Sequence, residues 1–141
     1  MAANQDHDRW LAQLLGCKPH RKPDLRGVEE VSGAYAWWLE QAEPVCLKVG
    51  IATPRRNDGL RGRLSDHFTS SYHTTTLARH LYRDRTSPWA RGRDFTTQRG
   101  RSAFMRGHCF FRYRVLDQLD ESTLREFEEH VERELRPVYI G

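Results

Sequence analysis

Glu128 stands beside the apolar face of a predicted helix near the end of the chain. Leu124, Phe127 and Val131 recur at helical spacing and form one stripe. Glu128 is four residues after Leu124 and three before Val131, so its carboxylate lies against this stripe, whereas Glu129 points away. A partly desolvated carboxylate is costly unless a positive group pairs with it. Two partners are open: one of the many arginines, or a divalent metal ion, which takes carboxylate oxygen and leaves its other positions to water and phosphate.

Arg63 and His67 form a second pair of chemically capable residues. They are four residues apart in a predicted helix over residues 59–72, so they lie together along one edge of its apolar stripe. A histidine at a helix edge more often makes a structural hydrogen bond than it moves a proton, and both roles stay open here.

Two predicted strands with a short connection position a tyrosine and a lysine. Residues 32–39 and 45–50 are rich in β-branched and aromatic side chains and have Gly or Pro at their borders. The residues between them are polar and end in proline, which favours a hairpin. Since residues two apart in a strand share a face, we expect Cys46 and Lys48 on one face. Tyr35 and Lys48 can then lie across from each other on one sheet.

The remaining pattern predicts a small α/β (α+β) fold: a three-stranded mixed or antiparallel sheet flanked by helices. In the final helix, Thr123 and Glu126 have capping-box spacing. An N-terminal accessory helix and linker over residues 1–28 are expected to precede the main domain over 29–141. The other predicted elements are helices over 7–15 and 74–84 and a strand over 109–116.

An arginine-rich insertion is expected over residues 83–107. Residues 87–107 show neither the helical nor the strand period, and so long a loop in a small domain is usually functional or mobile. Guanidinium groups there alternate with aromatic rings, as on surfaces that follow a nucleic-acid backbone. A solvated basic loop with a few aromatic anchors is the alternative. The arginines predicted to contact nucleic acid, here and after the second strand, are Arg55, Arg56, Arg61, Arg91, Arg93, Arg99 and Arg101.

Composition limits the class of protein. The 141 residues suit one compact domain, and 38% hydrophobic residues are enough to bury a core. The formal charge of +4 is compatible with a polyanionic partner but does not establish one. Three scattered cysteines make neither a disulfide framework nor a complete zinc site. No signal-peptide core and no apolar run of membrane-spanning length is found, so a cytoplasmic protein without a membrane partner is expected.

In chain order, these residues resemble the GIY-YIG nuclease family. Gly33-Ala34-Tyr35 stands where that family has its first tripeptide, and Lys48-Val49-Gly50 stands where it has its second. An arginine on a helix, here Arg63, then a strand, then a helix bearing Glu128 follow in the family's order. The resemblance covers roughly residues 30–140. Ala34 replaces the usual isoleucine, which affects packing, and Lys48 replaces the second tyrosine, which changes the chemistry.

The resemblance implies a metal-dependent endonuclease that hydrolyses DNA phosphodiester bonds. Tyr35 would act as general base, with Lys48, Arg63 and the metal lowering its pKa, and Glu128 would hold Mg²⁺ or Mn²⁺. The implied catalytic residues are Tyr35, Lys48, Arg63, His67 and Glu128. The alternatives are a non-catalytic nucleic-acid-binding domain of the same fold and, less favoured, a basic protein-interaction module.

The partner implied by the resemblance is duplex or branched DNA, and the sequence leaves RNA open. The chain has no room for a separate target-recognition domain. Specificity would then come from the arginine-rich insertion, the N-terminal piece, a homodimer or a partner subunit.

Overall fold

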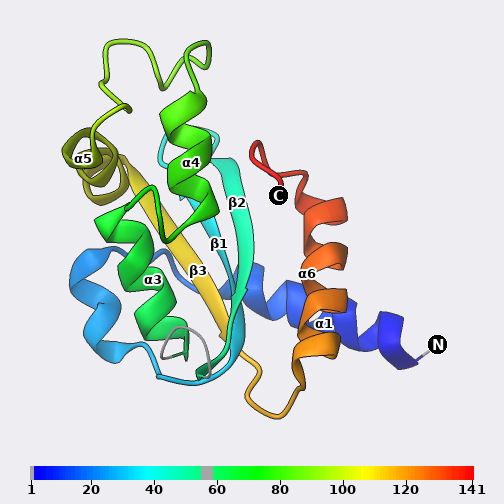
Figure 1. Ribbon diagram of the computed structural model, residues 1–141. Helices are drawn as coiled ribbons and strands as arrows, with labels where there is room; N and C mark the ends of the chain where they lie inside the picture. Colours follow the sequence, from blue (N-terminus) through cyan, green and yellow to red (C-terminus); the bar gives the residue numbers. More distant parts are fainter. Residues whose placement is uncertain (1, 55–58) are drawn as a thin grey trace.

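A three-stranded antiparallel sheet in the order β2-β1-β3 lies at the centre of the molecule (Figure 1). The computed structural model describes residues 2–54 and 59–141. The central strand β1 (Gly33–Leu39) pairs with β2 (Val45–Ala52) on one side and with β3 (Cys109–Val115) on the other. The predicted fold class is therefore confirmed, with the antiparallel alternative realised, and the predicted hairpin joins β1 to β2.

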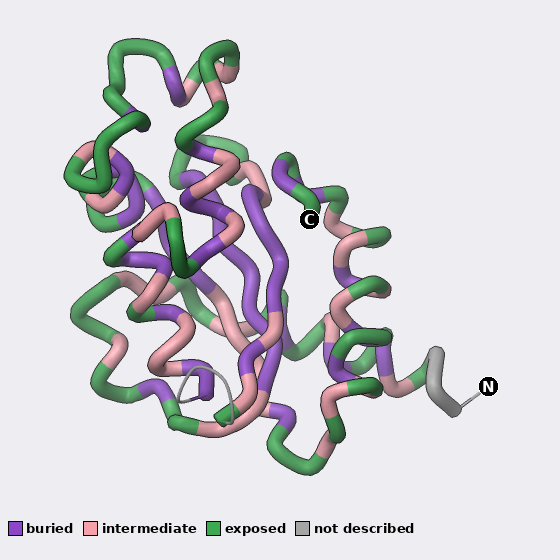
Figure 2. Tube along the Cα trace, in the orientation of Figure 1, coloured by how far each residue is buried: buried purple, intermediate pink, exposed green. Residues whose placement is uncertain are grey.

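Helices cover both faces of this sheet, each facing a separate apolar cluster. On one face, α1 and α6 pack over alternate residues of β1, including Ala36 and Trp38. On the other face, α3, α4 and α5 pack over Trp37 and Phe111. Figure 2 shows β1 buried along its whole length between these two layers. The helices are α1 (Ala2–Gly16), the 3-10 helix η1 (Lys22–Gly27), α3 (Gly59–Thr69), α4 (Thr76–Arg83), α5 (Gln98–His108) and α6 (Glu121–Leu135).

The arginine-rich insertion contains a helix where a loop was predicted. Thr97 caps α5, because its side chain accepts a hydrogen bond from the Gly100 amide at 3.0 Å. The residues of α5 that face inward are Arg101, Phe104 and Met105, at helical spacing. A charged residue at an inward position hides the period from a hydropathy pattern, so the prediction of a loop over 98–107 is wrong.

A break in strand register separates Cys46 from Lys48. Trp38 pairs with Cys46, whereas Trp37 pairs with Lys48, so Leu47 is an extra residue in β2. Directly paired residues share a face, and Trp37 and Trp38 point to opposite faces. Cys46 and Lys48 therefore lie on opposite faces, and the prediction that they share one is wrong. The bulge turns Lys48 toward the face that carries α3.

Both free edges of the sheet are partly covered by other segments. On the β3 side, His20 and Phe111 exchange backbone hydrogen bonds of 2.9 Å. On the β2 side, the amides of Val138 and Tyr139 donate to the carbonyl oxygens of Cys46 and Leu47 at 3.0 and 2.9 Å. The rest of the β2 edge stays open toward α6.

Side chains cap the N-termini of α4 and α6. Thr75 caps α4, because its side chain accepts a hydrogen bond from the Ala78 amide at 3.1 Å. In α6 the cap is Asp120, whose side chain accepts a hydrogen bond from the Thr123 amide at 2.8 Å, so the capping box predicted at Thr123 is wrong. Over residues 2–54 and 59–141, no helix has the length and apolar character needed to cross a membrane.

Candidate active site at the edge of the sheet

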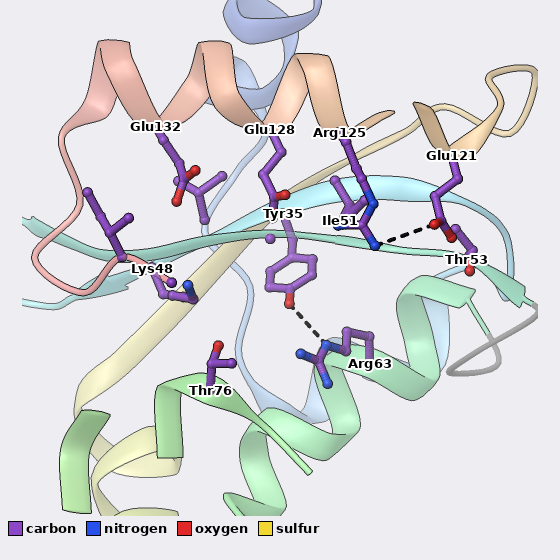
Figure 3. A pocket seen from close by; sticks show the side chains of 14 residues that line it. Tyr35, Lys48, Ile51, Thr53, Arg63, Thr76, Glu121, Arg125, Glu128 and Glu132 are labelled. Atoms are coloured by element: carbon purple, nitrogen blue, oxygen red, sulfur yellow. Dashed lines mark hydrogen bonds and ion pairs between the residues drawn. The ribbon is translucent and has the colours of Figure 1, made fainter. Parts of the chain in front are cut away.

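A pocket of about 480 Å³ opens along the uncovered part of the β2 edge. Its walls come from five elements, β1, β2, α3, α4 and α6, and from the segment after α6. Helix α6 approaches this edge from one face of the sheet, and α3 and α4 approach it from the other. Tyr35 of β1, Lys48 of β2, Arg63 of α3 and Glu128 of α6 all line it (Figure 3). Four of the five residues predicted to be catalytic are thus brought together, and His67 lies directly behind Tyr35.

The Tyr35 side chain reaches the pocket by crossing Gly50. These two residues are paired across the hairpin. A Cβ at Gly50 would lie 2.3 Å from Tyr35 Oη and 2.5 Å from Cζ, closer than real contacts allow. Tyr35 can therefore lie in this position only because residue 50 has no side chain. Lys48 is paired with Trp37, which is two residues along β1 from Tyr35. The prediction that Lys48 lies directly across from Tyr35 is therefore wrong.

The hydroxyl of Tyr35 is held by two side chains of α3. Arg63 Nε donates to Tyr35 Oη at 3.3 Å, and His67 Nε2 lies 2.8 Å from the same oxygen. Arg63 is fixed in turn because Nη1 donates to the Thr74 carbonyl oxygen at 2.9 Å. The i,i+4 spacing of Arg63 and His67 thus places both groups on one oxygen.

Burial decides the protonation of this group. It raises the pKa of Tyr35 above its ordinary value, and the Arg63 guanidinium offsets only part of the rise. Arg63 thus lowers the Tyr35 pKa as predicted, but burial outweighs it, so the net pKa lies above the ordinary value and not below it. Burial also holds the pKa of His67 well below its ordinary value, with Arg63 and Lys48 adding to the effect. At neutral pH the pair is a protonated tyrosine and an uncharged imidazole.

Lys48 faces a wall of carboxylates on α6. It is 7% exposed, and burial lowers its pKa, while Glu132 and Glu128 act in the opposite direction. Glu128 and Glu132 are one helical turn apart, and both reach toward the pocket (Figure 3). Burial, followed by the charge of Glu132, raises the pKa of Glu128. The predicted desolvation of Glu128 is confirmed, and Glu129, as predicted, is exposed.

The donor set suits a hard divalent cation. Within the described residues, no side chain or amide donates a hydrogen bond to the Glu128 carboxylate, so its oxygens are available to another ligand. Mg²⁺ and Mn²⁺ are commonly held by one or two carboxylates, with water and substrate phosphate completing the shell. No group of three or more His, Cys, Asp or Glu residues in the described parts of the chain forms a closed cage. Glu128, with Glu132 beside it, therefore fits an open metal site and not a structural one.

Two of the arginines predicted to contact nucleic acid donate hydrogen bonds to backbone carbonyl groups of the fold. Arg61 Nε donates to the Val28 carbonyl oxygen at 2.7 Å and so ties the segment before β1 to α3. Arg101 is 3% exposed, and its guanidinium donates to the carbonyl oxygens of Ser70 and Phe95 at 3.1 and 3.0 Å. Arg101 therefore has no accessible guanidinium to offer a phosphate, and most of the Arg61 guanidinium is occupied by contacts within the chain.

The other predicted contacts are on the surface or outside the described residues. Arg91, Arg93 and Arg99 are exposed. The Arg93 guanidinium lies 5.3 Å from the centre of the Phe104 ring. Arg55 and Arg56 lie outside the described residues.

Two features of the pocket were missed in the sequence. Glu132 follows Glu128 by four residues, so helical spacing alone could have placed it on the same face. Gly50 could be read only as part of a tripeptide, because its role depends on the register of the hairpin.

Comparison with protein-family models, curated proteins and solved structures finds no match for this chain.

Proposed function

We propose that the chain is a metal-dependent endonuclease of the GIY-YIG type that hydrolyses nucleic-acid phosphodiester bonds, with DNA as the substrate. One observation supports this most: Tyr35, Lys48, Arg63 and Glu128 come from four different elements and line one open pocket. A structural salt bridge would need only one cation and one carboxylate, and it would not need these four residues around an open pocket. Phosphodiester hydrolysis needs an activated water, charge stabilisation on the phosphoryl oxygens and help for the leaving oxygen.

Glu128, with Glu132 beside it, would hold the metal, which when bound supplies Lewis-acid stabilisation of phosphoryl charge. Lys48 and Arg63 add fixed positive charge on the opposite wall of the pocket. This placement suits a phosphate that lies between the two cations and the metal held by α6.

Tyr35 acts as base in this proposal by passing its own proton on. Because burial raises the Tyr35 pKa, a free tyrosinate is disfavoured. The hydroxyl lies 2.8 Å from His67 Nε2, and His67 is uncharged at neutral pH. As the attacking water gives a proton to Tyr35 Oη, the phenolic proton moves to His67 Nε2. This direction requires the tautomer of His67 that carries its proton on Nδ1.

The test is plasmid nicking with Mg²⁺ or Mn²⁺ by the wild type, Glu128→Gln and Glu129→Gln. Loss of the metal ligand should lower the cleavage rate by about 10³-fold or more, since metal-ion catalysis supplies several kcal/mol. Glu129→Gln removes the same charge from the exposed side of the same helix and should cut at the wild-type rate. Oligonucleotide binding in chelator should be similar for all three proteins.

Two outcomes count against the proposal. Wild-type cleavage by both variants would remove Glu128 as the metal ligand. Binding of oligonucleotides by a wild type that nicks with neither metal would favour the non-catalytic binding domain instead.

A further inference from the structure

A second hollow, of about 460 Å³, lies between α3, α5 and η1. Figure 1 shows α3 next to both α5 and η1, on the other side of the sheet from α6. Three cations line it: Lys22 of η1 and Arg99 and Arg106 of α5. None of its lining residues carries a carboxylate. The polar lining is completed by Ser65, Thr69, Gln98 and Ser102. We refer to this hollow as the basic groove.

The walls of the basic groove are fixed to each other. Ser102 Oγ donates to the Phe68 carbonyl oxygen at 2.7 Å, and Gln98 Nε2 donates to the Thr69 carbonyl oxygen at 3.2 Å. Arg101, on the inner side of α5, also donates to the chain that follows α3. The cations on the outer side of α5 are therefore presented by a rigid support.

The three cations of the basic groove are not used by the fold. Lys22, Arg99 and Arg106 form no hydrogen bond or ion pair with any residue in the described parts of the chain. Arg61 and Arg101, in contrast, are engaged by backbone carbonyl groups. A concave site with three uncompensated cations attracts a polyanion.

The basic groove and the pocket lie on different sides of α3. At about 100° per residue, Ser65 and Thr69 are roughly 200° and 240° around the helix from Arg63. One α-helix, about 10–12 Å across with its side chains, therefore separates the two sites. A strand bound in the pocket would pass around half of this helix to reach the basic groove. That path is roughly 16–19 Å and spans about five to six nucleotides, since successive phosphates of one strand rise by about 3.4 Å.

The chemistry of the lining favours backbone contacts over base contacts. Hydroxyl and amide groups, with Lys and Arg, are the usual partners of phosphate oxygens. Phe68, which lines the groove, is 2% exposed and offers no face for a base to stack on. Recognition there should therefore be independent of sequence.

We propose that the basic groove binds the phosphodiester backbone of the nucleic acid beyond the bond placed in the pocket. This inference deepens the proposed function and rests on it for the identity of the ligand. The groove adds affinity and orients the strand, and it does not take part in bond cleavage.

The test uses the full chain in chelator and a labelled oligonucleotide. Lys22→Gln/Arg99→Gln/Arg106→Gln should weaken binding by about tenfold or more and reduce the slope of log affinity against log salt by roughly 2 to 3, since each phosphate contact contributes about 0.9. The matched variant Lys18→Gln/Arg83→Gln/Arg133→Gln removes the same charge from three exposed positions outside the groove. It should bind within about threefold of the wild type, with an unchanged slope.

A charge-preserving variant and an acidic competitor distinguish a phosphate site from a general charge effect and from a protein-binding site. Lys22→Arg/Arg99→Lys/Arg106→Lys keeps the charge and should keep the affinity and the slope. Equal losses in the groove variant and the matched variant would overturn the proposal, because only net charge would then matter. Competition by polyglutamate as strong as that by the oligonucleotide would also overturn it, in favour of an acidic protein partner.

Failure of this inference is distinguishable from failure of the proposed function. A wild type that cleaves, with a groove variant that binds normally, overturns the groove alone. A groove variant that loses binding in a protein that never cleaves supports the groove and counts against the nuclease.

Discussion

Two neighbours of Glu128 act on the pKa of its carboxyl group in opposite directions. Burial raises this pKa, Glu132 raises it further, and Lys48 lowers it. Lys48→Met should therefore raise the Glu128 pKa, and Glu132→Gln should lower it. Because a carboxyl group must be ionised to bind a metal, the acid limb of Mn²⁺ affinity should move to higher pH in Lys48→Met. In Glu132→Gln the limb should move to lower pH, while the Mn²⁺ affinity at neutral pH should fall, because a carboxylate beside Glu128 is lost. Calorimetric titration from weakly acidic to neutral pH measures both effects.

Lys48→Arg is the control for this pair, since it keeps the charge and should leave the acid limb near its wild-type position. Shifts of the same sign in Lys48→Met and Glu132→Gln would contradict the electrostatic account. They would indicate that either change disturbs the α6 wall as a whole.

Four residues of the pocket, Tyr35, Lys48, Arg63 and Glu128, were predicted from the sequence, but their electrostatics were not. Glu128 was identified because a carboxylate beside an apolar stripe needs a partner, and the structure confirms its partial burial. The Tyr35 pKa was misjudged because the cost of burial depends on three-dimensional packing. Helix α3 covers Tyr35 with His67, and that burial outweighs the nearby charge of Arg63.

At the level of the strands, the hairpin depends on one residue without a side chain. Gly50→Ala would place a Cβ 2.3 Å from Tyr35 Oη. Because the tyrosine is enclosed by α3, the clash cannot be relieved by rotation of the ring alone. We expect the free energy of unfolding to fall by about 1–3 kcal/mol, as for overpacked cores. Urea denaturation measures this fall.

Gly107→Ala is the matched control. Gly107 lies within α5, and a Cβ there would meet nothing within 4 Å. Replacing a helical glycine with alanine should raise the free energy of unfolding by about 0.5–1 kcal/mol. Equal effects of the two substitutions would show that the space at Gly50 is not required by Tyr35.

The elements with a clean period were predicted, and those whose inward face carries a charge were not. β1, β2, β3, α3 and α6 follow apolar spacing and were placed to within a few residues. α5 was missed because Arg101 occupies a buried position in it. The hydrogen bonds that make this burial tolerable come from the carbonyl oxygens of Ser70 and Phe95, which lie outside the helix. The bulge at Leu47 was missed because an extra residue in a strand leaves no mark on composition.

At the level of the whole molecule, Tyr139 ties the segment after α6 to the opposite side of the sheet. It is 7% exposed, accepts a hydrogen bond from Trp89 Nε1 at 2.8 Å and donates one to the Asp84 carboxylate. Tyr139→Ala removes these contacts and leaves a cavity in the cluster under α4. The free energy of unfolding should fall by about 3 kcal/mol, as for other buried aromatic residues, and urea denaturation measures it.

Ile140→Ala provides the comparison for Tyr139. Ile140 is the next residue and is 59% exposed, so its truncation should change the free energy of unfolding by no more than about 0.5 kcal/mol. If Tyr139→Ala were equally mild, the contacts of the Tyr139 side chain with Trp89 and Asp84 would not stabilise the fold.

The pocket draws its walls from residues far apart in the chain, and this has a consequence for biosynthesis. Tyr35 is made early, whereas Glu128 belongs to α6. Ribosomes add about 5–20 residues per second, and domains fold as their parts emerge. A nascent chain that ends at α5 has neither the third strand beside β1 nor the carboxylates opposite Lys48. Tyrosine and carboxylate therefore first meet only after α6 has left the ribosome, later than the hairpin that carries Tyr35.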